Sequence, residues 1–81
     1  MLISLVDMRP GETGIVADIQ GGLGTTERIQ GMGIRIGKKI KKTGSGFWRG
    51  PQTVLVDNFK AALGFGIASK IFVEVERSEN K

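Results

Sequence analysis

The amino-acid sequence predicts an all-β fold, a small SH3-like barrel of about five to six strands with one short helix inserted near residues 25–32. Two observations lead to this prediction. Short segments in which apolar and polar side chains alternate recur along the chain, as they do in half-buried strands. Thirteen glycines, together with pairs such as Asp57-Asn58, separate these segments by close turns. The OB barrel is the second architecture that fits this pattern.

The first predicted strand follows a turn at Pro10-Gly11. Proline fixes φ and glycine accepts the positive φ that comes next, which suits the central pair of a type II turn. Residues 15–20 then alternate in the manner of a half-buried strand. One side of this strand carries Ile15, Ala17 and Ile19, and the other carries Val16, Asp18 and Gln20. Gly21-Gly22 ends it.

Residues 25–32 predict a helix of one to two turns. Thr25 or Thr26 can act as its N-cap, because a hydroxyl there accepts a hydrogen bond from a free backbone amide. Glu27 would then lie in the first turn, where a negative charge suits the helix dipole.

The end of this helix has a more specific signal. Gly33 can take the left-handed C′ position, which puts Ile29 at C3 and Ile34 at C″. These are the two positions whose side chains touch in a Schellman motif. Gly31 inside the last turn costs roughly 1 kcal/mol relative to alanine. The sequence therefore predicts that the helix ends just before Gly33.

Lysines dominate the next predicted strand, residues 38–43, in which Ile40 is the lone apolar residue. We expect this strand at an edge or a rim of the sheet, because charged lysines protect an exposed edge from pairing with other chains. The stretch that follows, TGSGFWRGP over residues 43–51, is a loop by composition.

The rest of the chain predicts three strands, over residues 52–57, 59–63 and 71–75. Asp57-Asn58 fits a tight hairpin turn between the first two, since both residues tolerate left-handed φ. Gly64-Phe65-Gly66 breaks the second strand, and residues 67–70 fit one helical turn.

The length of the chain, 81 residues, allows one domain. We place it at residues 1–76 and expect residues 77–81 to form a solvated tail. The opening MLISLV has no basic flank and meets Asp7 at once, so it does not fit a signal peptide. Because the apolar stretches are too short to cross a bilayer, we expect a cytoplasmic protein.

The composition argues against catalysis and against a tight metal site. The chain contains no cysteine and no histidine, which excludes disulfides and thiol catalysis and removes the usual ligands of iron and zinc. Glu74 and Glu76 share one face of the last strand, a pattern more typical of a solvent-facing strand than of a cation site. The Gly-x-Gly triplets lack the third glycine of a dinucleotide fingerprint. We expect a protein without cofactors that is not an enzyme.

Basic residues concentrate in one stretch. Between Arg35 and Arg49 there are six lysines or arginines and no acid. This pattern is typical of a patch that binds an acidic protein surface, a phosphate backbone or lipid head groups, and equally of edge-strand protection. In the loop at its end, Phe47 is expected to cap the barrel, and Trp48 beside Arg49 is the better candidate for a contact with a partner.

Several short motifs occur in a recognisable order. They are Pro10-Gly11-Glu12, Met32-Gly33-Ile34 with Gly37, Gly50-Pro51, and a final Ala-x-x-Ile-x-Val motif, Ala68-Ser69-Lys70-Ile71-Phe72-Val73. In this order and spacing they resemble the ferrous iron transport protein A (FeoA) family over nearly the whole chain. The resemblance implies an SH3-like barrel and a role as a cytoplasmic accessory of the ferrous iron transporter FeoB, a membrane protein with a GTP-binding domain.

On this reading the helix and the lysines form one charged face for docking, and the protein is peripheral to the membrane through its partner. The residues predicted to bind the partner are Arg28, Met32, Arg35, Lys39, Lys41, Trp48 and Arg49. A small RNA- or DNA-binding barrel is the competing interpretation, although we expect no stable nucleic-acid binding. Self-association through a sheet edge is a third.

Overall fold

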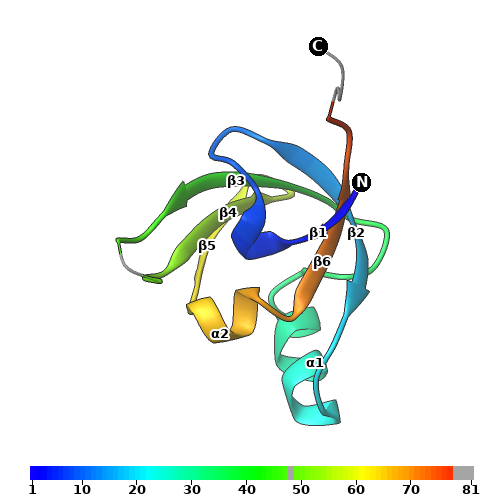
Figure 1. Cartoon of the computed structure of the whole chain (residues 1–81). Coiled ribbons are helices and arrows are strands. Elements are labelled where there is room, and N and C mark those ends of the chain that lie inside the picture. Colours follow the sequence, from blue (N-terminus) through cyan, green and yellow to red (C-terminus); the bar gives the residue numbers. More distant parts are fainter. Residues whose placement is uncertain (48, 78–81) are drawn as a thin grey trace.

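The computed structural model describes residues 1–47 and 49–77, which form one antiparallel sheet with short helices at its end (Figure 1). Its strands are β1 (Leu2–Ser4), β2 (Thr13–Ile19), β3 (Lys39–Ser45), β4 (Gln52–Val56), β5 (Phe59–Leu63) and β6 (Ile71–Val75). The helices are α1 (Leu23–Gly31), α2 (Phe65–Ala68) and a 3-10 turn, η1 (Leu5–Asp7).

The strand order is β1-β6-β2-β3-β4-β5. Figure 1 shows that the sheet curls around η1 and that α1 and α2 lie together at one end. This confirms the predicted all-β barrel with a helix inserted between two strands. The alternation pattern gave five of the strands and missed β1, because Leu2–Ser4 is too short to show a period of two.

The core is built from the inward side of every long strand, closed by η1 and by the end of α1. The buried apolar residues are Leu5, Met8, Val16, Ile29, Ile34, Ile40, Val54, Val56, Leu63, Ala68, Ile71, Val73 and Val75. Each large one stabilises the fold by roughly 1.5–3 kcal/mol relative to an exposed side chain. In β4 and β6 every second residue is buried, which confirms that these two segments are half-buried strands.

Strand β2 presents the core with Val16 and Gly14 and turns Ile15 outward, 43% exposed. Gly14 is required by a close approach of backbones. A Cβ there would lie 2.4 Å from Val73 Cγ1 and 2.6 Å from the Glu74 carbonyl oxygen on β6. The absence of a side chain at Gly14 lets the two strands pair, and it leaves one inward-facing position of β2 without an apolar side chain.

The start of α1 differs from the prediction. The N-cap is Gly22, in an extended conformation and without a capping side chain, so the assignment to Thr25 or Thr26 is wrong. The Thr26 amide already donates to the Gly22 carbonyl, and its hydroxyl donates to Leu23. The helix begins two residues early, at Leu23, and its N-cap is a glycine without a side chain that could accept a hydrogen bond.

The end of α1 is as predicted. Gly33 has φ of 88°, its amide donates to the Gln30 carbonyl at 2.9 Å, and the Ile34 amide donates to the Ile29 carbonyl at 3.4 Å. These are the two hydrogen bonds of a Schellman motif. Ile29 and Ile34 are both fully buried, so the motif also anchors α1 to the core.

The prediction that residues 38–43 form an edge strand is wrong. Strand β3 lies inside the sheet between β2 and β4, and it extends to Ser45, which shortens the predicted loop. Its lysines do not protect an edge. Alternate residues face opposite sides, so Lys39 and Lys41 point outward whereas Lys42 is fully buried beside Ile40.

The remaining turns follow the sequence closely. Asp57 and Asn58 have φ of 52° and 69°, which confirms the tight hairpin between β4 and β5. Gly11 has φ of 91°, as the Pro-Gly turn requires. The predicted helical turn at residues 67–70 is α2, which begins two residues earlier at Phe65. No helix among the described residues is long and apolar enough to cross a membrane.

The expected boundary after residue 76 stays a prediction. Arg77 forms an ion pair with Glu12 at 2.7 Å and donates to the Asp7 carbonyl, so it ties the end of β6 to the beginning of the chain. The rest of the predicted tail, residues 78–81, lies outside the described residues.

Candidate functional site

The outer face of the sheet carries two rows of paired side chains, since residues opposite one another in an antiparallel ladder project to the same side. One row is Leu2, Glu74, Ile15 and Lys39, on β1, β6, β2 and β3. The next is Thr13, Lys41, Leu55 and Lys60, on β2, β3, β4 and β5. We call these two rows together the outer face.

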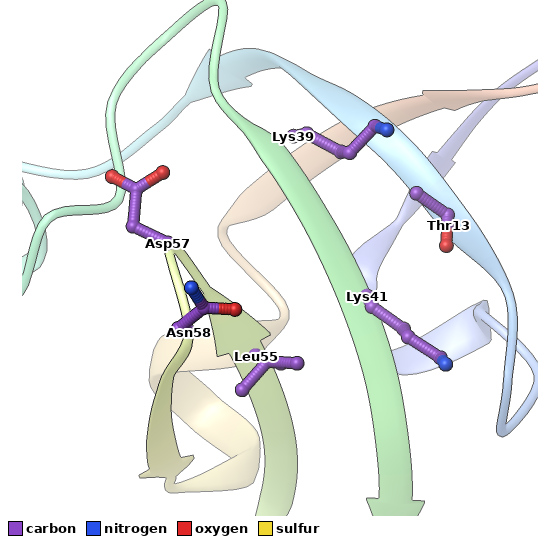
Figure 2. Close-up of a pocket in the computed structure, with 6 residues that line it drawn as sticks. All are labelled: Thr13, Lys39, Lys41, Leu55, Asp57 and Asn58. Carbon is purple, nitrogen blue, oxygen red and sulfur yellow. The ribbon is translucent and has the colours of Figure 1, made fainter.

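A groove of about 360 Å³ crosses one half of the outer face (Figure 2). Its lining comes from β2, β3, β4 and the turn before β5, and consists of Thr13, Lys39, Lys41, Leu55, Asp57 and Asn58. Figure 2 shows the two lysines along β3 with Leu55 beside them. We call this the lysine groove.

The charges at the lysine groove are unevenly paired. Lys38 binds Asp57 through Nζ and Oδ2 at 2.6 Å, which neutralises the one acid of the lining. Within residues 1–47 and 49–77, neither Lys39 nor Lys41 has an ion-pair partner. The groove therefore offers two free ammonium groups next to an apolar side chain and an amide.

A second groove, of about 420 Å³, lies on the other side of β2. It is lined by Thr13, Gly14, Ile15, Glu74 and Glu76, and we call it the acidic groove. The terminal ammonium of Met1 binds the Glu74 carboxylate, whereas Glu76 has no ion-pair partner among the described residues. Thr13 lines both grooves, so the two meet over β2.

Lys42, on the opposite side of β3, was not among the predicted site residues. Its Nζ donates to the carbonyl oxygens of Leu5 and Met8 at 3.0 Å each and of Val6 at 3.4 Å. Burial lowers the pKa of Lys42 from its usual value, although the nearby carboxylates of Asp7 and Glu12 act in the opposite direction. Lys42 thus holds η1 in place from inside the barrel.

The other predicted partner-binding residues lie on separate elements. Arg28 is in the last turn of α1, Met32 is its C-cap, and Arg35 lies in the connection to β3. The guanidinium of Arg49 lies over the ring of Phe65, 5.4 Å from its centroid, and Trp48 lies outside the described residues. The structure brings Lys39 and Lys41 together in one groove, which the other described members of the predicted set do not line.

Phe47 is 85% exposed, so the expectation that it caps the barrel is wrong; the short connection between β3 and β4 leads it away from the core. In the part of the chain that the structure describes, no three acidic side chains gather at a point that could hold a metal ion.

Comparisons with known proteins point to one family. The sequence model of the FeoA domain matches residues 3–75. A Methanocaldococcus jannaschii protein to which the name Fe(2+) transport protein A is assigned is 38% identical over 66 residues, or 82% of this chain and 78% of that protein. A crystal structure of an iron uptake regulatory protein (FeoA) matches with a TM-score of 0.83 at 32% identity, covering 91% of this chain and 96% of the other.

Two further structures match the fold at lower identity. An FeoA-like protein from Clostridium acetobutylicum has a TM-score of 0.83 at 22% identity and covers 99% of this chain and 93% of its own. A manganese-dependent transcriptional repressor has a TM-score of 0.85 at 24% identity, where the match spans 93% of this chain but 42% of the repressor. The same barrel therefore occurs both as a separate protein and as part of a larger one.

Proposed function

This chain belongs to the FeoA family of ferrous iron transport, and on that basis we propose that it is a non-enzymatic docking protein that binds the cytoplasmic region of a FeoB-type transporter and modulates iron uptake. The lysine groove is the observation that supports this proposal most directly. It combines two unpaired ammonium groups, Lys39 and Lys41, with the partly buried Leu55. A protein segment that carries acidic side chains around an apolar one would match it.

The barrel suits docking because the groove lies on a rigid surface. Lys39 and Lys41 are on a strand that pairs on both sides, so their backbone positions are fixed before a partner arrives. Binding then costs the ordering of two side chains, roughly 0.5–1.5 kcal/mol each, and no ordering of a loop. Modulation of the transporter further requires that the barrel bind one transporter conformation more tightly than another.

The competing interpretation, an RNA- or DNA-binding barrel, draws on the same basic stretch but has less free charge than the sequence implies. Lys42 is buried and Lys38 is paired with Asp57, so these two lysines of the stretch are not free to contact a phosphate. This leaves few ammonium groups to release counterions from a phosphate backbone, and nucleic-acid affinity depends mainly on that release.

Binding kinetics on the isolated cytoplasmic region of the transporter test the proposal. We expect Lys39→Glu with Lys41→Glu to lower the association rate about 10-fold at low salt, because opposite charges steer the encounter. The matched control, Arg9→Glu with Lys70→Glu, changes the net charge equally on exposed residues outside the groove and should leave the rate nearly unchanged.

The same experiment on RNA distinguishes the two interpretations. We expect weak RNA affinity at physiological salt. Submicromolar RNA binding with a steep salt dependence, together with no measurable binding to the transporter, would favour the nucleic-acid barrel and contradict the docking proposal.

A further inference from the structure

The outer face carries its charges in an order that is complementary to itself. Acidic side chains lie on β6 (Glu74) and directly after it (Glu76), neutral ones on β2 and basic ones on β3. Because β2 lies between β6 and β3, the acidic residues are one strand away from β2 on one side and the basic residues are one strand away on the other.

The register of the ladders makes this order specific. Ile15 pairs with Glu74 on one side and with Lys39 on the other, which gives one row of acid, apolar residue and base. Thr13 pairs with Lys41 and shares the acidic groove with Glu76, which gives a second row of acid, hydroxyl and base. The two rows are adjacent and have their charges in the same direction.

We propose that the outer face is an interface for a second copy of this chain. A rotation of 180° about an axis along β2, in the plane between two facing sheets, carries β6 of one copy over β3 of the other. Glu74 then faces Lys39 of the second copy, and Glu76 faces Lys41. The axis makes each contact occur twice, as in an isologous dimer, and brings Ile15 against its own counterpart.

The exposed apolar residues of this face fit such a contact. Leu2 and Ile15 are 56% and 43% exposed and lie in the same row as Glu74 and Lys39. They would be covered in the dimer, while the charged pairs set the orientation of the two copies. The Met1 ammonium, which binds Glu74 in the single chain, would lie beside the new ion pair.

The size of the face predicts a weak and reversible dimer. The five strands centred on β2, from β1 to β4 in the sheet, have a spacing of about 4.8 Å and a length of about 17 Å. They give at most roughly 400 Å² for each partner, because the sheet curls away on either side of β2, and this is half of what a stable interface buries. Charged contacts at this surface are screened by salt, so the dimer should dissociate as the ionic strength rises.

This inference does not rest on the proposed docking function, because a dimer is measured without any transporter. The two are linked by the residues that lie in both surfaces, which are Thr13, Lys39, Lys41 and Leu55. A dimer would cover the lysine groove, so self-association and transporter binding would exclude one another.

Two charge-reversed variants test the dimer by sedimentation equilibrium at low salt. The acidic variant is Lys39→Glu with Lys41→Glu and lowers the net charge from +4 by 4, to 0. The basic variant is Glu74→Lys with Glu76→Lys and raises it from +4 by 4, to +8. We expect the wild type to show a monomer–dimer equilibrium, each variant alone to be monomeric, and an equimolar mixture to regain wild-type association as a heterodimer.

The control mixture replaces the acidic variant with Arg9→Glu and Lys70→Glu, which has the same net charge of 0 but an unchanged outer face. This control variant should form homodimers as the wild type does, because its outer face is intact. It should not draw the basic variant into heterodimers, because Lys39 and Lys41 of the control would then face substituted lysines. The proposal is overturned by a wild type that stays monomeric at low salt, by dimers of either variant alone, or by a variant mixture that stays monomeric. It is also overturned if the basic variant enters dimers with the control as fully as with the acidic variant.

Discussion

Replacing Lys42 by methionine removes an ammonium group from the interior of the barrel while keeping the length and the apolar stem of the side chain. In the wild type this group supplies donors to the carbonyls of Leu5, Val6 and Met8. These carbonyls belong to the N-terminal turn, which closes the core over β3. The substitution therefore tests whether a buried cation holds that turn in place.

The magnitude follows from the carbonyls that lose a donor. The Leu5 carbonyl keeps a hydrogen bond from the Met8 amide at 3.1 Å, and the Val6 contact with Lys42 is long at 3.4 Å. The main loss is thus one well-made bond to the Met8 carbonyl, in a buried residue, where an unsatisfied group costs about 1–3 kcal/mol. For a domain of this size we expect the melting temperature to fall by about 4–8 °C for each kcal/mol lost.

Thermal and denaturant melts of Lys42→Met and Lys41→Met measure this effect. Lys41 is exposed on the same strand, so its substitution should change the stability by less than about 0.5 kcal/mol. If Lys42→Met is as stable as Lys41→Met, the ammonium costs as much to desolvate as its three hydrogen bonds return, and the anchoring role is refuted.

The pH dependence of the same variant gives a second signature. Burial lowers the pKa of Lys42 below its unfolded value of 10.5. Between these two pKa values the unfolded chain binds more protons than the folded one, so wild-type stability should rise with pH in that window. Lys42→Met should lack this rise.

Three further predictions concern the turn, the acid limit and metal. Gly33→Ala should destabilise the fold by about 1–2 kcal/mol in denaturant melts, because φ of 88° is strained for a residue with a side chain. Gly31→Ala meets no neighbour and should stabilise α1 by up to about 1 kcal/mol. Equal effects of the two substitutions would show that the helix does not end at Gly33. The hydrogen bond from Arg77 lowers the pKa of Glu12 from 4.5 to about 2, so the Glu12 carboxylate contributes stability above pH 4.5 that is lost as the pH falls toward 2. Melts of Glu12→Gln should lack this part of the loss of stability in acid. A loss in acid equal to that of the wild type would contradict the prediction. Anaerobic calorimetry with ferrous iron should show no tight stoichiometric site, since the chain has neither cysteine nor histidine, and a one-to-one micromolar site would overturn this.

Features that depend on neighbours in the sequence could be predicted. The Schellman end of α1 needs only Gly33 with Ile29 and Ile34 at fixed spacing, and the hairpin at Asp57-Asn58 needs only two residues that tolerate positive φ. In both cases the local backbone conformation determines the outcome, and the side chains that favour it are adjacent or one helical turn apart.

Features that depend on strands distant in the sequence could not be predicted. Strand β3 is internal because β2 and β4 pair on either side of it, and its lysine-rich composition does not reveal these partners. Lys42 lies two residues after the apolar Ile40 and so faces the same side of β3, which is a local indication that it is buried. The carbonyls that accept its hydrogen bonds, however, come from a turn 34 to 37 residues earlier in the chain. Lys39 and Lys41 share a groove because alternate residues of β3 face the same side of the sheet. No such local rule brings Arg28 of α1 or Arg49 of the connection between β3 and β4 to that groove, and neither lines it.

Ferrous iron uptake by cells that lack the native protein tests the docking claim most directly. Cells would carry the wild type, the Lys39→Glu with Lys41→Glu variant, or the Arg9→Glu with Lys70→Glu control, each at equal abundance. We predict that the wild type and the control restore uptake and that the groove variant does not. Full restoration by the groove variant would show that the lysine groove is not the surface through which this protein acts on the transporter.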